Sequence, residues 1–275
     1  MTNGALNNKH ENFCLSKWYL DFAGENGEAM IFYAAQLTWH SMSAKYTSWL
    51  SYNPESGVVL KSRFRKVQMP VLDRDVITWK DSDFGVSGTW SASMQMIQAR
   101  LFDSKEGYLD WECYQPASKV KLLINERTLT GVGYAEQLTL TASPWRIPMD
   151  ELRWGRFGSD SYNLVWIELR KSDKKQWLWL NGEKIGTCLI EDDRIVIQEG
   201  NLTLYLDRQV ILESEKKIQS VVGKIIRYLP NFHKSIPLGF LMADETKWLS
   251  KCELHSNGKV ISNGTAIHEL VNFKQ

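Results

Sequence analysis

The sequence lacks the features that several large classes of protein require. No apolar run approaches the roughly 20 residues that a membrane-spanning helix needs. Lys and Arg total 33 against 32 for Asp and Glu, so there is no basic excess of the kind that nucleic-acid-binding proteins carry. Residues 1–11 are polar and contain no apolar stretch typical of a secretory leader. We therefore expect a cytoplasmic protein that neither spans a membrane nor binds nucleic acid.

Metal-binding and nucleotide-binding motifs are also missing. The five histidines are widely spaced, without His-x-His or HExxH, which argues against zinc or non-haem iron. A Gly-x-Gly with no third glycine is a weak dinucleotide signal, and no Gly-x-Ser-x-Gly marks a nucleophilic serine. These patterns predict no metal site. Without a secretory leader, free thiols are expected of the four isolated cysteines: Cys14, Cys113, Cys188 and Cys252.

Aromatic residues are abundant by contrast, with 12 Trp, 10 Tyr and 10 Phe. Large rings fill protein cores, but Trp and Tyr also line cavities and interfaces where one end of the ring stays polar. Two interpretations are therefore open. Either the rings fill the core of a β protein, or some of them line a pocket for a hydrophobic ligand.

Apolar and polar residues alternate with a period of two along most of the chain, which predicts β-strands. Residues 177–180 lead into Asn181-Gly182, a pair typical of a type I′ hairpin turn. The only helix-like segment is short, at residues 148–154. We predict an all-β fold of about 14 to 18 short antiparallel strands. Among them are strands over residues 30–39, 162–167, 202–206, 221–229, 240–243 and 266–273.

So many strands exceed one small barrel, because about eight strands already enclose a ligand-sized interior. Two stacked barrels or strongly bent sheets fit the number better. Pro144 and Pro148 interrupt the alternation where proline would break a hydrogen-bonded ladder. We therefore expect two domains, residues 1–145 and 146–275.

Reactive side chains gather around this boundary. Residues 131–136 (Gly-Val-Gly-Tyr-Ala-Glu) supply Tyr134 and Glu136. Residues 145–157 add two tryptophans and three arginines: Trp145, Arg146, Arg153, Trp154 and Arg156. Charged groups beside aromatic rings predict a pocket for a hydrophobic ligand that has one reactive point.

Four short motifs resemble the lipocalin-like hydroxyneurosporene synthase family. They are Trp-Tyr-Leu-Asp-Phe at residues 18–22 with the glycine turn after it, residues 131–136, Trp-Gly-Arg-Phe at 154–157, and residues 264–269. Relatives of this family include carotenoid 1,2-hydratases, tocopherol-cyclase-like proteins and decalin-forming pericyclases. The resemblance implies two lipocalin-like antiparallel β-barrel domains of calycin type packed together, a hydrophobic substrate, and neither a metal nor an organic cofactor.

The chain departs from this family at two places. Ser16-Lys17 stands where an acidic residue usually precedes the aromatic pair, and residues 135–139 lack the histidine that the hydratases have near Glu136. These departures weigh against a hydratase.

Glu136 is the candidate catalytic acid. In an apolar cavity its pKa would rise, so it would hold a proton near neutral pH and could protonate an alkene or carbonyl. Alternatively, Glu136 pairs with Arg153 or Arg156 and only fixes the boundary. Tyr134 either donates a hydrogen bond to a substrate carbonyl or packs on the two glycines, which mark a bulge or a close backbone approach.

Arg153 and Arg156 are three residues apart, so on a helical turn they would share a side and grip a substrate carboxylate or enolate. Alternatively, they form ion pairs with Glu151 or Asp160. The candidate catalytic residues are therefore Glu136, Tyr134 and Arg156. The candidate substrate-binding residues are Trp18, Tyr19, Trp39, Trp145, Arg153, Trp154 and Trp166.

Together these features favour a cofactor-free cyclase or isomerase acting on a hydrophobic polyene, polyketide or isoprenoid in natural-product biosynthesis. The alternatives are a non-catalytic lipocalin-like carrier of a hydrophobic small molecule and a carotenoid hydratase-type lyase. A carbohydrate-binding β-sandwich remains a third possibility if the tryptophans lie on an exposed face.

Overall fold

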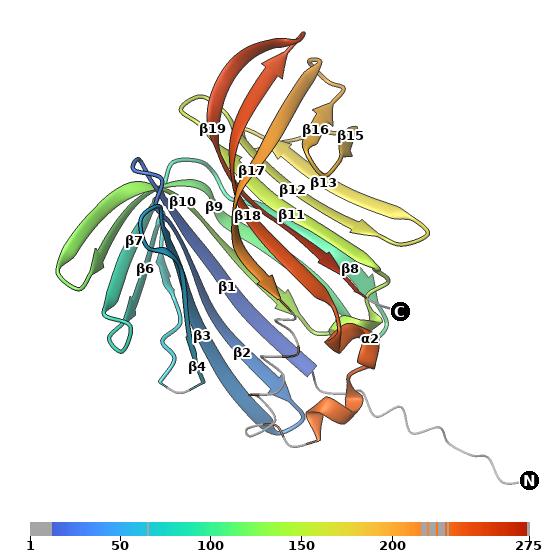
Figure 1. Ribbon diagram of the computed structural model, residues 1–275. Coiled ribbons are helices and arrows are strands. Elements are labelled where there is room, and N and C mark those ends of the chain that lie inside the picture. Colours follow the sequence, from blue (N-terminus) through green and yellow to red (C-terminus); the bar gives the residue numbers. More distant parts are fainter. Residues whose placement is uncertain are drawn as a thin grey trace, which may run out of the picture.

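The computed structural model describes residues 13–64, 66–215 and 231–273, together with the single positions 219, 224 and 229. Within these residues two large antiparallel sheets form the molecule (Figure 1). Sheet A has the strand order β4-β3-β2-β1-β10-β9-β7-β6-β5, with β8 paired to β9. Sheet B has the order β14-β13-β12-β11-β19-β18-β17-β16-β15.

The strands of sheet A are β1 (Phe13–Gly24), β2 (Ala29–Trp39), β3 (Met42–Asn53), β4 (Gly57–Arg63), β5 (Val71–Asp73), β6 (Val76–Asp81), β7 (Val86–Ala92), β8 (Ile97–Ser104), β9 (Gly107–Ile124) and β10 (Arg127–Leu140). Those of sheet B are β11 (Glu151–Gly158), β12 (Asn163–Arg170), β13 (Lys174–Leu180), β14 (Glu183–Lys184), β15 (Cys188–Ile190), β16 (Arg194–Ile197), β17 (Leu202–Glu215), β18 (Asp244–Ser256) and β19 (Lys259–Asn272). Three short helices complete the described elements: η1 (Pro144–Arg146), η2 (Phe232–Ser235) and α2 (Leu238–Leu241).

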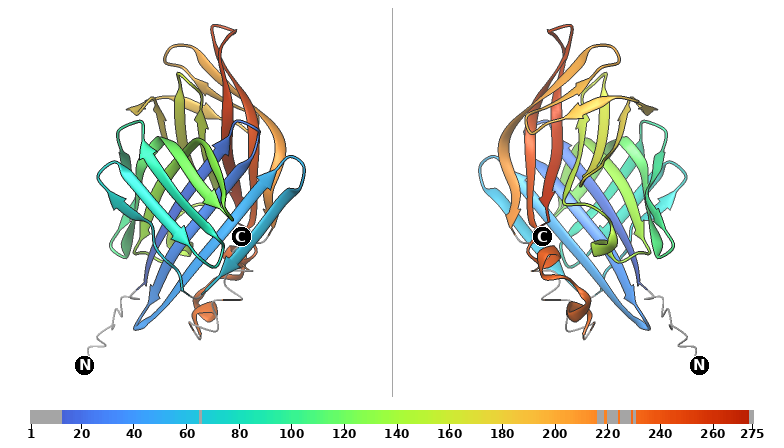
Figure 2. Two further views of the ribbon diagram at one scale, coloured as in Figure 1. Left: turned by 90° about the vertical axis from the view of Figure 1, so that its left-hand side faces the viewer. Right: turned by 90° about the vertical axis from the view of Figure 1, so that its right-hand side faces the viewer.

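The predicted all-β fold of two lipocalin-like sheets packed together is confirmed. Sheet A curls into a half-barrel, and sheet B lies against it (Figure 2). The first sheet ends at Leu140 and the second begins at Glu151, with η1 between them. The division of the chain into domains at residue 145 stays a prediction. In the described part of the chain, no helix is long and apolar enough to cross a membrane.

Two local predictions are wrong. Residues 148–154 were expected to form a turn or helix, but Glu151 opens β11, which pairs with both β12 and β19. Residues 240–243 were expected to be a strand, but Phe240 belongs to α2, which follows Pro237. A short apolar run does not distinguish a strand from a buried helical turn. The strand predicted over residues 221–229 lies outside the described residues, apart from positions 224 and 229.

Asn181 and Gly182 have φ angles of 51° and 83°. Both residues of a type I′ turn need positive φ, and Asn and Gly tolerate it best. The predicted hairpin between β13 and β14 is therefore confirmed.

Alternation along the strands produces three apolar layers. One lies on the inner face of sheet A and contains Trp18, Phe32 and Trp90. A second covers the face of sheet B that points away from sheet A and includes Phe157 and Trp166. The third lies between the sheets and draws side chains from both. In this middle layer Trp111 of β9 stacks on Trp179 of β13, with ring centroids 4.9 Å apart.

The Gly-x-Gly motif lets β10 approach β1 closely. A Cβ atom on Gly131 would collide with the carbonyl oxygen of Ala23, and one on Gly133 with that of Asp21. The space beside Gly133 is used by the indole of Trp90, whose Nε1 donates to Asp21 O at 2.7 Å. The pairing of β10 with β9 also shifts register between Gly133 and Ala135. The motif is therefore a packing device, as the close-approach interpretation predicted.

Candidate functional site

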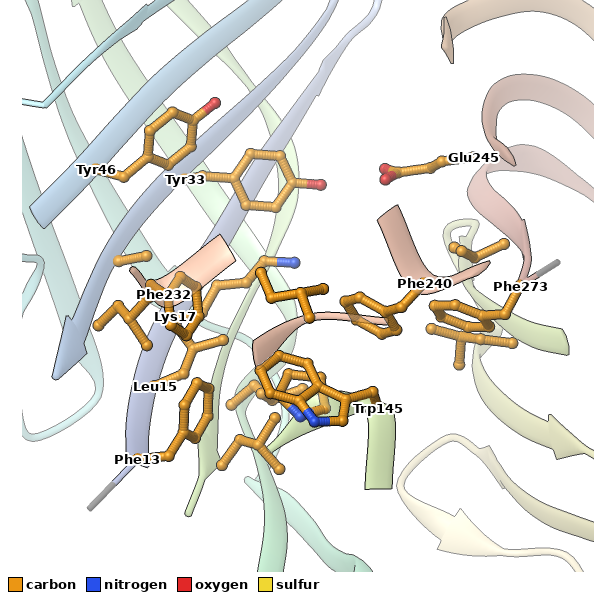
Figure 3. Close-up of a pocket in the computed structure, with 18 of the residues that line it drawn as sticks. Phe13, Leu15, Lys17, Tyr33, Tyr46, Trp145, Phe232, Phe240, Glu245 and Phe273 are labelled. Atoms are coloured by element: carbon orange, nitrogen blue, oxygen red, sulfur yellow. The ribbon is translucent and has the colours of Figure 1, made fainter. Parts of the chain in front are cut away.

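A cavity of about 330 Å³ lies between the two sheets (Figure 3). Its size falls at the lower end of the range of pockets for small organic ligands, about 300 to 1,000 Å³. The walls come from β1, β2, β3 and β10 of sheet A, from β11, β18 and β19 of sheet B, from η1, and from the segment that carries η2 and α2. The lining residues are Phe13, Leu15, Lys17, Tyr33, Ala35, Leu37, Ala44, Tyr46, Leu138, Leu140, Pro144, Trp145, Leu152, Phe232, Ile236, Phe240, Glu245, Glu269, Val271 and Phe273.

Alternation places these side chains on one face of each strand. Along β1 the cavity receives Phe13, Leu15 and Lys17, and the same face continues through Tyr19 to Asp21. On β10 the lining residues are Leu140 and Leu138, followed on the same face by Glu136 and Tyr134. The register pairs Leu15 with Leu140, Tyr19 with Glu136, and Asp21 with Tyr134. The cavity is therefore apolar near the start of β1 and becomes polar further along it.

Aromatic rings surround the apolar end. Phe232 of η2 stacks on Phe13, with centroids 6.4 Å apart, and packs against Trp145 at 6.1 Å. Phe240 of α2 stacks on Phe273 at 5.2 Å and meets Trp145 edge-on at 6.0 Å. The short segment 231–243 thus covers this end of the cavity with rings (Figure 3).

The polar end of the cavity carries four ionisable side chains, two from each sheet: Lys17 and Tyr33 from sheet A, and Glu245 and Glu269 from sheet B. In Figure 3 the Lys17 ammonium and the Tyr33 hydroxyl point toward Glu245. The Lys17 Nζ lies 4.6 Å from the centre of the Tyr33 ring.

Lys247 lies behind the two glutamates and is fully buried. Its Nζ donates to Glu245 Oε1 at 3.2 Å and to a carboxylate oxygen of Glu269. Burial alone would lower the pKa of Lys247, but Glu269, Tyr33 and Glu245 raise it well above its usual value. Lys247 is therefore a fixed cation that holds both glutamates in place.

Glu136 lies one step deeper than the cavity wall and is only 8% exposed. Three neutral groups donate to the same oxygen, Oε2: the Tyr134 hydroxyl at 2.5 Å, the Trp154 indole at 3.2 Å, and the Trp111 indole. Burial raises the pKa of Glu136 above its usual value, although the bonds from Tyr134 and Trp111 oppose this. Glu136 is thus buried, and the hydrogen bonds that it accepts come from aromatic donors instead of Arg153 or Arg156; its catalytic role stays a prediction.

Arg156 is also buried, but it belongs to an ion pair that joins the sheets. Its Nη2 and Nε bind the two oxygens of Asp21 at 2.6 and 2.8 Å, and the Tyr19 hydroxyl donates to the same carboxylate at 3.1 Å. Burial alone would lower the pKa of Arg156, but Asp21 and the hydroxyls of Tyr19 and Tyr134 raise it. Bidentate pairs of this kind fix orientation as well as charge.

Arg153 and Arg156 do not form a fork. Because β11 is a strand, residues three apart point to opposite faces. Arg153 turns away from the cavity, where its Nε binds Glu151 and its Nη1 binds Asp192, both at 2.6 Å. The ion pair with Glu151 that the sequence offered as an alternative is therefore present, whereas the shared side is not.

The other predicted binding residues fall into three groups. Trp145 lines the cavity. Tyr19, Trp39 and Trp154 belong to the same inter-sheet layer but do not line the cavity. Trp18 and Trp166 lie on the opposite faces of their strands, in the layers that face away from the cavity. The roles assigned to these residues stay predictions.

Four residues of the polar end escaped the sequence analysis: Lys17, Tyr33, Glu245 and Glu269. Alternation does place Lys17 on the face of Tyr19, and Glu269 on the face opposite His268, as the structure shows. No local signal, however, indicates that the two sheets bring these side chains together. Over the described ranges, no three His, Cys, Asp or Glu side chains are grouped as metal ligands.

Several solved structures resemble this one, and they include the following three. An AttH-like protein of Nitrosomonas europaea has a TM-score of 0.56 at 10% identity, covering 95% of this chain and 93% of that one. The chain has the AttH-like fold. Two others with this fold are CghA crystallised with Sch210972 (TM-score 0.57, 10% identity, 96% and 89% covered) and kievitone hydratase from Nectria haematococca (0.52, 12%, 96% and 90%). No protein-family model and no curated protein matches the sequence.

Proposed function

We propose that the chain is a cofactor-free cyclase that folds a hydrophobic polyene, polyketide or isoprenoid in the cavity between its sheets. The observation that carries this proposal is the cavity itself, which has apolar aromatic walls and ionisable groups at one end. Such walls can hold a flexible substrate molecule in a folded conformation. Proximity and orientation of this kind lower the activation barrier of a reaction by at most about 7 to 11 kcal/mol.

Glu136 is the candidate proton donor. All three of its hydrogen bonds converge on Oε2, which leaves Oε1 as the position for a proton. In the proposed reaction this proton passes to an alkene or carbonyl of the substrate, and the resulting cation closes the ring. The cyclised cation then loses a proton to the Glu136 carboxylate, which restores both the neutral product and the acid form of Glu136. Tyr134 and Trp154 act as positioning residues, because their donors orient the carboxyl group.

The relatives by fold support an enzyme that handles a small organic molecule. One is named a hydratase, and another was crystallised with Sch210972. A hydratase would use the same first proton transfer and then admit water, so it remains the alternative with the same machinery. A carrier is favoured by one observation: Glu136 lies behind the cavity wall instead of on it.

A carbohydrate-binding module is the least supported candidate. It needs tryptophans on an exposed face, yet nine of the 12 tryptophans are buried and the remaining three, Trp145, Trp177 and Trp248, are half-buried.

Mass spectrometry separates the surviving candidates. The full chain is incubated with a panel of linear prenyl alcohols and polyenes that quench its tryptophan fluorescence. The masses and chromatographic retention of the products are then measured. A cyclase returns an isomer of unchanged mass but altered retention, a hydratase adds the mass of one water, and a carrier returns the probe unchanged. Glu136→Gln is expected to keep the quenching and lose the isomer. Wild-type protein that binds the probes and returns all of them unchanged would overturn the proposal.

A further inference from the structure

Trp111 connects the Glu136 carboxyl group to the packing of the two sheets. It lies on β9 of sheet A, is only 1% exposed, and donates from its indole Nε1 to Glu136 Oε2. An indole N–H lies in the plane of its ring, and a hydrogen bond weakens steeply when the donor is misaligned. The contacts that fix the plane of the Trp111 ring therefore control how well this bond is made.

Trp179 of β13, in sheet B, stacks on the Trp111 ring. The two ring centroids are 4.9 Å apart, and the angle between the ring planes is 28°. Trp179 is 5% exposed and belongs to the inter-sheet layer, but it does not line the cavity. Stacked aromatic rings attract each other in a specific geometry. Turning the Trp111 ring out of its present plane would therefore lose its contact with Trp179.

Sheet B thus completes the surroundings of an acid that belongs to sheet A. Trp154 of β11 donates directly to Glu136 Oε2 at 3.2 Å. Trp179 acts one residue further away, through Trp111. The hydrogen bond from Trp111 opposes the rise in the pKa of Glu136 that burial causes. A change at Trp179 that loosens the Trp111 ring should therefore raise this pKa further.

We propose that Trp179 is a positioning residue for the acid of the cyclisation. It holds the Trp111 indole so that the N–H meets Glu136 Oε2, which leaves Oε1 for the proton that is transferred. This inference rests on the proposed function of Glu136, although the effect of Trp179 on the carboxyl group exists without turnover.

Trp179 carries no charge, so a substitution there leaves every ionisable group around Glu136 present. The groups that act on Glu136 include Lys17 and Tyr19 of β1, Cys113 of β9, Tyr134 of β10 and Glu269 of β19. Leucine and phenylalanine are both smaller than tryptophan, so each leaves space beside Trp111, but only phenylalanine keeps a flat ring. A comparison of Trp179→Leu with Trp179→Phe therefore isolates the stacking.

The first readout is the rate of isomer formation, followed by mass spectrometry and retention. Trp179→Leu is expected to lower kcat roughly tenfold, a part of the 10²- to 10⁴-fold that a positioned acid contributes. KM is expected to stay unchanged, because Trp179 does not line the cavity. Trp179→Phe is expected to restore most of kcat. Activity falls as the pH rises through the pKa of Glu136, and this fall should come at a higher pH in Trp179→Leu than in Trp179→Phe.

Trp49→Leu is the matched control. Trp49 is 7% exposed and also stacks on an aromatic ring, that of Phe32, but it lies in the layer on the inner face of sheet A. This variant is expected to keep the kcat and the pH profile of the wild type. A loss in Trp49→Leu equal to that in Trp179→Leu would overturn the inference, because any missing buried indole would then have the same effect.

The second readout needs no turnover. Urea unfolding at a series of pH values compares each Trp179 variant with the same variant carrying Glu136→Gln. The stabilising contribution of Glu136 is lost as the pH rises through its folded pKa, and in Trp179→Leu this loss should extend to higher pH than in Trp179→Phe. Identical kcat values and stability profiles for the two variants, or a change in KM alone, would overturn the inference. The expected stability profiles without turnover of any probe would support the positioning role and count against the proposed function.

Discussion

At the scale of single residues, the site treats its two buried acids differently. Burial raises the pKa of Asp21, while the guanidinium of Arg156 opposes that rise by binding the carboxylate. Glu136 receives only neutral donors, so its charge is stabilised less and burial dominates. The sequence singled out Glu136 and left open whether it lies in an apolar cavity or pairs with an arginine. It could not supply the donors, because Trp111 lies 25 residues away and meets Glu136 only through the register of β9 with β10.

Because the pKa of Glu136 is raised in the folded protein, this residue lowers the free energy of unfolding at higher pH. An acid whose pKa is higher in the folded state stabilises the fold at low pH, and this contribution is lost as the pH rises through the folded pKa. Wild-type protein is therefore expected to lose stability relative to Glu136→Gln above the ordinary glutamate value of 4.5. The slope is about 1.4 kcal/mol per pH unit until the folded pKa is passed. Urea unfolding at a series of pH values measures the difference.

Glu183→Gln provides the control, because Glu183 is exposed. Its unfolding free energy should follow that of the wild type across the same pH series. A Glu136→Gln profile parallel to the wild type would show that the carboxyl is ionised normally in the folded protein.

At the scale of elements, alternation predicted which side chains share a face, and it succeeded where the strand was regular. The strands predicted over residues 30–39 and 266–273 correspond to parts of β2 and β19. Alternation failed for β11, where two prolines and the spacing of Arg153 and Arg156 favoured a helix. The period of two is present there, with Leu152, Trp154 and Arg156 on the face toward sheet A. Because Arg156 is charged, however, this face does not read as apolar in the sequence, and the alternation could not be recognised. A buried ion pair is thus the physical reason for the error.

Gly133→Ala tests the close contact of β10 with β1. The added methyl group would meet the backbone carbonyl oxygen of Asp21 and the side chain of Val120, and it would crowd the Trp90 indole. Overpacking of this kind costs about 1 to 3 kcal/mol, and we expect a loss of that size in the free energy of unfolding. Thermal and denaturant unfolding measure it.

Gly158→Ala is the matched control, since it is also a strand glycine but its Cβ would meet only Arg156 at an ordinary 3.7 Å. This change is expected to be neutral or slightly stabilising, because alanine restricts the unfolded chain. Equal losses in the two variants would contradict the close-packing role of Gly133.

At the scale of the whole molecule, the functional features depend on how the two sheets dock. The sequence indicated two β units and a pocket at or between them, yet it held no signal for which faces meet. The cavity, the four residues of its polar end and the Asp21–Arg156 pair all arise at that interface. Residues of β1 and β18 that are more than 200 positions apart become neighbours only there, so local patterns cannot identify them.

A double-mutant cycle measures the link between the sheets. Asp21→Ala and Arg156→Ala each leave a buried charge without its partner, which costs about 3 to 5 kcal/mol. The double variant is expected to lose much less than the sum of the two. Because the pair is buried and bidentate, the coupling should exceed that of the solvent-exposed Arg100–Asp110 pair, which water and salt screen. Additive losses would show that the two side chains do not interact in solution.

The cavity lies where the two sheets meet, and side chains of both sheets form its walls. A substitution that enlarges the cavity for a bulkier ligand therefore removes packing contacts between the two sheets. A substitution that improves this packing makes the cavity smaller. We expect variants with broadened ligand range to melt earlier, and any engineering of selectivity in this protein to require compensating changes on both sides at once.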